Sequence, residues 1–202
     1  MMKHKVTCYS GGESRLMDWS QNWRGDLLRP LLLQLSKRGL RADHITLLSL
    51  IAGLGFVPAI LFAQPALALA LLFLHVLLDG LDGPLARHCG QQSNRGSFTD
   101  TMADQVVVTA STLALIQSGY ASPWPGGLYL FLYATVVAFA MVRNALDEPY
   151  SWLLRPRFFV FAWIAVEAYL WPGSLDVVLW VASAILALKA LTGFVRIRRR
   201  ME

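Results

Sequence analysis

The sequence predicts an all-α integral membrane protein with six transmembrane helices, preceded by an amphipathic helix in the membrane interface. Hydrophobic residues make up 55% of the 202 residues and charged residues 15%, whereas charged residues form about 25% of a typical soluble domain. Apolar runs near the length of about 20 residues that crosses a bilayer recur along the chain. They predict spans at residues 43–63, 66–87, 97–118, 126–146, 157–172 and 175–196.

Residues 1–42 precede the first span and are expected to form a cytoplasmic tail and the interfacial helix. Residues 19–40 mix tryptophan and leucine with arginine and lysine, which suits a helix with its apolar face among lipid headgroups and its cations near anionic lipid. Pro30 predicts a kink, because proline cannot donate a helical hydrogen bond. A basic linker is the alternative. Residues 1–38 show no apolar run before a small-residue cleavage site, so no cleavable signal is expected.

Turn-forming residues separate the six apolar runs and delimit the elements that follow the tail. These breaks are Gln64-Pro65, residues 90–97, residues 123–127, Glu148-Pro149 and Pro172-Gly173. The fifth run is short, so a helix there can tilt little in the bilayer. We therefore expect a six-helix domain over residues 43–196 and a basic cytoplasmic tail over residues 197–202.

Lysines and arginines occur ahead of the first span, around the second and fourth loops and at the chain end, whereas the first, third and fifth loops contain none. The positive-inside rule then puts both termini and the even-numbered loops in the cytoplasm, for a protein of the inner (cytoplasmic) membrane or an equivalent one. This pattern accounts for the net charge of +5 without a nucleic-acid partner. Cys8 and Cys89 indicate neither a disulfide framework nor a zinc site.

Four aspartates lie within the second and third predicted spans, at Asp79, Asp82, Asp100 and Asp104. A carboxylate at the bilayer centre costs roughly 2.5 to 3.5 kcal/mol on insertion scales, so a cluster of them requires a compensating partner. The spacings of three and four residues put each pair on one face of its helix. Because the short loop between the spans makes the two helices antiparallel neighbours, the acidic faces can converge. We expect this site to open to the cytoplasm.

Converging carboxylates repel one another unless cations lie between them. Ligation by oxygen alone suits hard ions, so a pair of Mg²⁺ ions is the expected occupant, with Mn²⁺ or Ca²⁺ as alternatives. Gly83, Ala86 and Gly96 leave room for a bulky ligand near the backbone, although small residues also serve ordinary helix packing. Arg87 can bind a phosphate with both arms of its guanidinium. Together these residues predict a site for a metal-bound diphosphate.

The acidic region follows the pattern D-x-x-D-G-x-x-A-R, eight further residues, then G-x-x-x-D-x-x-x-D, from Asp79 to Asp104. This pattern resembles the complete signature of the CDP-alcohol phosphotransferase family, also called the CDP-alcohol phosphatidyltransferase family. The resemblance covers the whole chain. It implies a six-helix membrane domain with an N-terminal interfacial helix, assembly as a homodimer, and transfer of a phosphatidyl group from CDP-diacylglycerol to an alcohol with release of CMP.

The resemblance also implies roles for the signature residues. Asp79, Asp82 and Asp100 would be metal ligands, and Asp104 would join the site as general base for the acceptor hydroxyl. Spacing alone cannot distinguish a base from a fourth ligand, so Asp104 is also expected among the metal ligands. The CDP moiety would be held by Asp82, Gly83, Ala86, Arg87 and Gly96. Residues 42–46 match the family's Pro-Asn-x-Ile-Thr only at Ile45 and Thr46, so we do not assign Thr46 to the nucleotide site.

The signature does not identify the alcohol acceptor, so its prediction depends on residues outside the signature. Arg143, Arg155, Arg157 and Lys189 lie at cytoplasmic ends of, or inside, later spans and could gather around a phosphate on the acceptor. Arg155 and Arg157 could instead be anchors that reach the headgroups. We expect a phosphorylated polyol, with glycerol 3-phosphate first and inositol phosphate second; serine and phosphatidylglycerol are further alternatives.

Two other functions are considered. An enzyme of the same family could transfer a CDP-linked aminoalcohol to diacylglycerol, but that uncharged acceptor would leave the basic residues without an anion. A cation channel or transporter would also turn aspartates inward, but Arg87 on the same face would oppose cation permeation. His75, one turn before Asp79, is interpreted as an interhelical packing residue, with a hydrogen bond to a ligand carboxylate as the alternative.

Overall fold

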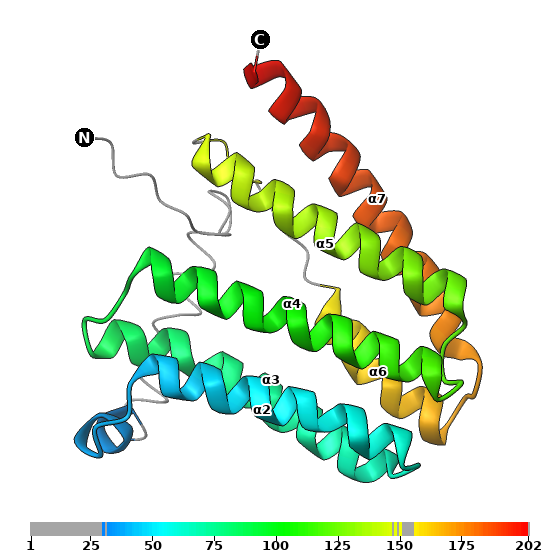
Figure 1. Cartoon of the computed structure of the whole chain (residues 1–202), viewed down its shortest axis with the longest axis horizontal. Helices are drawn as coiled ribbons and strands as arrows, with labels where there is room; N and C mark the ends of the chain where they lie inside the picture. Colours follow the sequence, from blue (N-terminus) through cyan, green and yellow to red (C-terminus); the bar gives the residue numbers. More distant parts are fainter. Residues whose placement is uncertain (1–29, 31, 147, 149, 151–155, 202) are drawn as a thin grey trace.

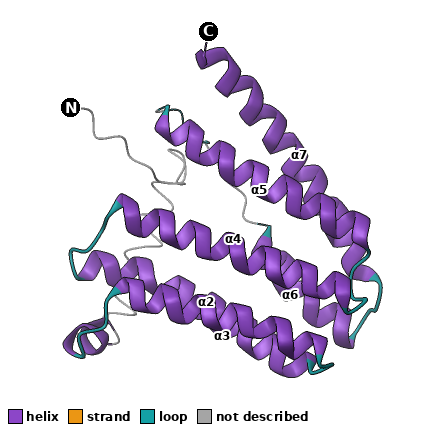
Figure 2. Cartoon of the chain, in the orientation of Figure 1, coloured by secondary structure: helices purple, strands orange, loops and turns teal. Residues whose placement is uncertain are grey.

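The computed structural model describes residues 30, 32–146, 148, 150 and 156–201. Within these residues the chain is helical, with turns between long helices and no strand, as Figures 1 and 2 show. The main helices are α2 (Ala42–Leu61), α3 (Pro65–His88), α4 (Asn94–Gln117), α5 (Pro123–Ala145), α6 (Arg157–Tyr169) and α7 (Ser174–Met201). The prediction of an all-α protein is confirmed.

The helix ends follow from local sequence. α3 and α5 each begin with a proline, which suits the first turn of a helix because the amide hydrogen it lacks would have no helical partner there. Ser93 precedes α4, and its hydroxyl accepts a hydrogen bond from the amide of Gly96 at 3.0 Å. Gly119, two residues after the end of α4, has a φ of 79°, a conformation that glycine adopts without steric cost.

Four helices, α2, α3, α5 and α7, are long and apolar enough to cross a membrane, judged by length and composition over the described residues. α6 has 13 residues, or about 20 Å of helix, and ends at Tyr169 rather than residue 172. α4 carries Asp100 and Asp104. Four spans are therefore supported, and crossing by α4 and α6 stays a prediction.

Two segments, one before α2 and one at the end of α7, were predicted to lie outside the six-helix domain. The predicted interfacial helix over 19–40 lies mostly outside the described residues, as does the region where Pro30 would produce a kink; residues 32–37 are helical. Leu32 packs there against Ile45 and Leu85. Residues 197–201, expected as a separate basic tail, continue α7.

Two groups of helices make up the molecule. α2 packs along α3 and α4, whereas α5 packs along α7, and α6 contacts α7 and α3. In Figure 1 the beginnings of α2 and α4 and the ends of α3 and α5 lie toward one side, so the acidic parts of α3 and α4 are neighbours. Gly53 permits the close approach of α2 to α4, because a Cβ atom there would lie 2.6 Å from Val107.

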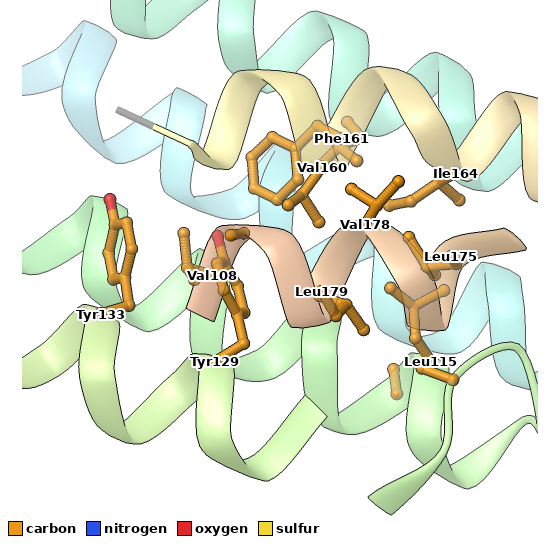
Figure 3. Close-up of a cluster of buried hydrophobic side chains, with 14 of the residues drawn as sticks. Val108, Leu115, Tyr129, Tyr133, Val160, Phe161, Ile164, Leu175, Val178 and Leu179 are labelled. Carbon is orange, nitrogen blue, oxygen red and sulfur yellow. The ribbon is translucent and has the colours of Figure 1, made fainter. Parts of the chain in front are cut away.

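A cluster of buried apolar side chains joins the two groups, as Figure 3 shows. It includes residues of α4, α5, α6 and α7. The labelled members are Val108, Leu115, Tyr129, Tyr133, Val160, Phe161, Ile164, Leu175, Val178 and Leu179. Van der Waals packing of this kind holds helices together where lipid replaces water around them.

Candidate active site

Three carboxylates of the signature lie together between α3 and α4. Asp79, Asp82 and Asp100 each offer an oxygen, and these oxygens lie within 4.8 Å of one another. Asp82 is buried, with 6% of its surface exposed, and the other two are half-buried. Oxygen donors at this separation fit a hard divalent cation, which would offset their mutual repulsion. These three residues could therefore hold the metal.

Thr46 of α2 also belongs to this group. Its hydroxyl donates a hydrogen bond to Oδ2 of Asp82 at 2.8 Å, and the threonine is itself buried. Residues 42–46 match the family motif only in part, so Thr46 was not assigned to the site from the sequence. The retained isoleucine and threonine of that motif were the signal that pointed to it.

Replacing Thr46 by valine should weaken divalent-metal affinity by about 10- to 100-fold, the usual cost of removing a hydrogen bond to a metal-binding carboxylate. Valine keeps the shape but leaves Oδ2 of Asp82 without its donor. Binding of Mn²⁺ to the purified protein, followed by electron paramagnetic resonance, measures the effect. Thr46→Ser, which keeps the hydroxyl, is the matched control. Equal affinities for all three proteins would contradict this role of Thr46.

A cleft of about 620 Å³ opens beside the carboxylates, within the range of roughly 300 to 1,000 Å³ typical of ligand pockets. All the predicted CDP-binding residues line it: Asp82, Gly83, Ala86, Arg87 and Gly96. The cleft also has polar walls that sequence analysis did not identify. Those residues are Asp43, Gln91, Gln92, Ser93, Asn94 and Ser97. Most belong to the segment inside the signature whose residue types are not specified, so the pattern could not single them out.

Asp104 is not one of the three clustered carboxylates, but it shares a partner with Asp79. One of its oxygens forms an ion pair with Nη1 of Arg157, and Nη2 of the same arginine donates to Oδ2 of Asp79 at 2.9 Å. Arg157 is the first residue of α6 and has 2% of its surface exposed. A buried guanidinium requires anionic partners, and the two aspartates supply them. The expectation that Asp104 is also a fourth metal ligand stays a prediction.

His75 connects α3 to α2. Its Nδ1 lies 2.8 Å from the hydroxyl of Ser49, and that hydroxyl donates to the carbonyl of His75 at 3.0 Å. Nε2 lies 4.0 Å from Oδ1 of Asp104, beyond hydrogen-bonding distance. This arrangement agrees with an interhelical packing residue.

The structure describes three of the four cations expected at the acceptor, and these three have different partners. Arg157 contacts the aspartates, while Arg143 and Lys189 lie beside the ring of Tyr150, at 3.9 and 5.9 Å from its centroid. Burial raises the pKa of the Tyr150 hydroxyl, while Arg143 acts in the opposite direction. Arg155 lies outside the described residues.

Comparison with known proteins places the chain in a family. The family model of CDP-alcohol phosphatidyltransferase matches residues 40–195. A probable phosphatidylglycerophosphate synthase of Mycobacterium tuberculosis is 30% identical over 173 residues, covering 80% of this chain and 81% of that one. A CDP-diacylglycerol–serine O-phosphatidyltransferase of the same organism is 37% identical over 106 residues, which is 52% of this chain. That match spans 37% of the relative's length.

A solved structure has the same fold. The phosphatidylinositol phosphate synthase of Mycobacterium tuberculosis with CDP-DAG bound superposes with a TM-score of 0.72 at 17% identity, over 83% of this chain and 92% of that one. A second structure of that synthase contains manganese and citrate. The named relatives differ in the alcohol that they use. The motif, its geometry and the match over residues 40–195 agree, and the chain belongs to the CDP-alcohol phosphatidyltransferase family.

Proposed function

We propose that this protein transfers a phosphatidyl group from CDP-diacylglycerol to an alcohol and releases CMP. The observation that carries the proposal is the set of three carboxylates beside a cleft lined by every predicted CDP-binding residue. The three carboxylates would hold the metal ions that bind the diphosphate, and the cleft would hold the nucleotide. Two relatives support CDP-diacylglycerol as the donor. One is named a CDP-diacylglycerol–serine O-phosphatidyltransferase, and the other is a synthase whose structure contains CDP-DAG.

The metal of this reaction would be held by Asp79, Asp82 and Asp100. We propose two Mg²⁺ ions, with Mn²⁺ or Ca²⁺ as alternatives, and manganese in the structural relative supports a divalent ion. Bound there, such ions would polarise the diphosphate and stabilise the charge on the leaving phosphate. Gly83, Ala86 and Gly96 would leave space for the CDP moiety, and Arg87 would bind a phosphate of that moiety.

Asp104 is proposed as the general base. Oδ1 of Asp104 is buried and has no hydrogen-bond partner among the described residues, whereas Oδ2 is paired with Arg157. Oδ1 would take the proton of the acceptor hydroxyl as the alcohol oxygen attacks the lipid-linked phosphorus. The bond from that phosphorus to the CMP oxygen breaks, and CMP leaves with the electron pair.

A phosphorylated polyol is the proposed acceptor, with glycerol 3-phosphate first and inositol phosphate second. Arg143 and Arg157 are buried cations, and Lys189 lies beside the same tyrosine as Arg143. Arg155 stays in the proposed acceptor site on the basis of its sequence position alone. Such cations suit the doubly charged phosphate monoester of a polyol phosphate better than zwitterionic serine, the singly charged phosphodiester of phosphatidylglycerol or uncharged diacylglycerol. The match over 81% of a probable phosphatidylglycerophosphate synthase supports glycerol 3-phosphate.

The proposed setting is a homodimer in the inner (cytoplasmic) membrane or its equivalent, with six crossings that include α4 and α6. The lysine and arginine pattern supports cytoplasmic termini and a cleft that opens to the cytoplasm. In Figure 1 the beginnings of α2 and α4 lie on the same side as the ends of α3 and α5. This arrangement supports a cleft at one side of the membrane.

Release of CMP tests this function. The purified protein with Mg²⁺ and CDP-diacylglycerol should release CMP when glycerol 3-phosphate is added, and less with inositol phosphate, inositol, serine or phosphatidylglycerol. Removal of Mg²⁺ by a chelator should stop the reaction. Fastest release with inositol, serine or phosphatidylglycerol would overturn the proposed acceptor, and release only from CDP-aminoalcohols with diacylglycerol would overturn the proposed donor. Ion flux through vesicles without any CMP release would instead favour a channel.

A further inference from the structure

Tyr150 lies in the connection between α5 and α6 and joins the end of α5 to the second half of α7. It is buried, with 5% of its surface exposed, although it belongs to no helix. Its hydroxyl donates a hydrogen bond to the carbonyl of Lys189 at 3.1 Å. A buried tyrosine outside the helical core requires an explanation, because connecting segments usually run over the surface.

Two cations lie beside the ring of this tyrosine. The guanidinium carbon of Arg143 is 3.9 Å from the ring centroid and Nζ of Lys189 is 5.9 Å from it. Both distances fall within the range of about 6 Å over which an aromatic face attracts a cation. The ring therefore stabilises two like charges, one from α5 and one from α7, that would otherwise repel each other.

The same segment also fixes the direction of Arg143. Its Nε donates to the carbonyl of Glu148 at 2.9 Å, and the carboxylate of Glu148 accepts from Nε of Arg200 at 2.6 Å. Glu148 and Tyr150 thus bind both helices, and Arg143 is held between a carbonyl and an aromatic face. A side chain held in this way loses little further freedom when it binds an anion.

α7 provides a niche for the tyrosine. A Cβ atom added to Gly193 would lie 2.0 Å from the hydroxyl oxygen of Tyr150 and 3.1 Å from its Cζ. No side chain larger than hydrogen fits there while Tyr150 keeps its place. Glycine at this position lowers helix stability relative to alanine. Its presence is explained by the space that the Tyr150 ring and hydroxyl occupy.

We propose that Tyr150 is a specificity-determining positioning residue, which holds Arg143 and Lys189 together so that both receive the phosphate of the acceptor. This inference rests on the proposed phosphorylated acceptor. Tyr150 acts through the two cations, so its loss should affect the acceptor and not the CDP-lipid. A purely structural role would instead lower thermal stability and affect both substrates.

The first experiment removes the ring. Tyr150→Leu should raise the KM for glycerol 3-phosphate roughly tenfold or more, as expected for losing cation–π contacts in a buried site, with the KM for CDP-diacylglycerol unchanged. Tyr150→Phe, which keeps the ring, should recover most of the affinity for the acceptor. Arg143→Ala should raise the same KM. Tyr169→Leu removes an exposed tyrosine of α6 and is the matched control, with wild-type values expected.

A second pair of variants tests the niche and does not depend on Tyr150→Leu folding. Gly193→Ala should displace the tyrosine and raise the acceptor KM. Adding Tyr150→Phe should restore it, because removal of the hydroxyl oxygen removes the closest contact of the new Cβ. Failure of the double variant to recover would contradict a positioning role for the ring.

Comparing glycerol 3-phosphate with glycerol separates the two proposals. A wild-type enzyme without preference for the phosphorylated form would overturn the phosphorylated acceptor, and the inference with it. A clear wild-type preference together with an unchanged acceptor KM in Tyr150→Leu would overturn the inference alone. Equal rises in both KM values would assign Tyr150 a structural role and overturn the inference as well.

Discussion

Asp104→Asn should abolish turnover while leaving CDP-diacylglycerol binding measurable. An amide cannot take the proton of the acceptor hydroxyl, and loss of a general base costs about 10²- to 10⁴-fold in rate. The substitution keeps the size of the side chain, and Arg157 keeps its hydrogen bond to Asp79. CMP release measures the turnover rate, and equilibrium binding measures the affinity for CDP-diacylglycerol.

Asp176→Asn is a matched control for Asp104→Asn. Asp176 accepts a hydrogen bond from the amide of Ser122 at 2.8 Å, at the beginnings of α5 and α7, whereas Arg143 lies at the end of α5. Its variant should keep normal turnover. Normal turnover in Asp104→Asn would remove Asp104 from the role of base, and loss of CDP-lipid binding would indicate that this residue holds the nucleotide site together.

Asp82→Asn should remove both metal binding and turnover. Asp82 is the most buried of the three clustered carboxylates and accepts the hydrogen bond from Thr46. Its neutral replacement takes one charge from the group, so divalent-metal affinity should fall by more than the roughly 10- to 100-fold that is typical for loss of an outer hydrogen-bond partner. Electron paramagnetic resonance of Mn²⁺ with the purified variant gives the affinity independently of catalysis.

Comparing the two variants distinguishes a ligand from a base. If Asp104 is a base alone, Asp104→Asn should keep the Mn²⁺ affinity of the wild type while Asp82→Asn loses it. A comparable loss of Mn²⁺ in both would make Asp104 a fourth ligand. Wild-type Mn²⁺ affinity in Asp82→Asn would refute the assignment of the metal to this cluster.

Much of the helical architecture could be predicted from local sequence. Pro65 and Pro123 begin α3 and α5, and long apolar runs coincide with helices. The prediction of spans was less complete, because length and composition support four of them. α6 is short, and α4 has a polar first half. Hydrophobicity alone therefore did not establish what these two helices do in the membrane.

The acidic site was predicted in outline, because its spacing puts side chains on one face of each helix. Asp79, Asp82 and Asp100 lie together accordingly. The partners of this cluster were not predictable in the same way. Thr46 comes from α2 and Arg157 from the beginning of α6, 78 residues after Asp79, and no local periodicity relates such distant residues.

The sequence by itself determined the helices, the faces on which the aspartates lie and the family to which the motif belongs, because these depend on residues within a few turns of one another. Only the tertiary structure decided the rest. It gave the three described cations of the predicted acceptor site different partners, with Arg157 at the aspartates and Arg143 and Lys189 beside Tyr150. The physical reason is that a buried charge takes the partner that helix packing brings within reach, and close approaches such as that of Gly53 to Val107 set that packing.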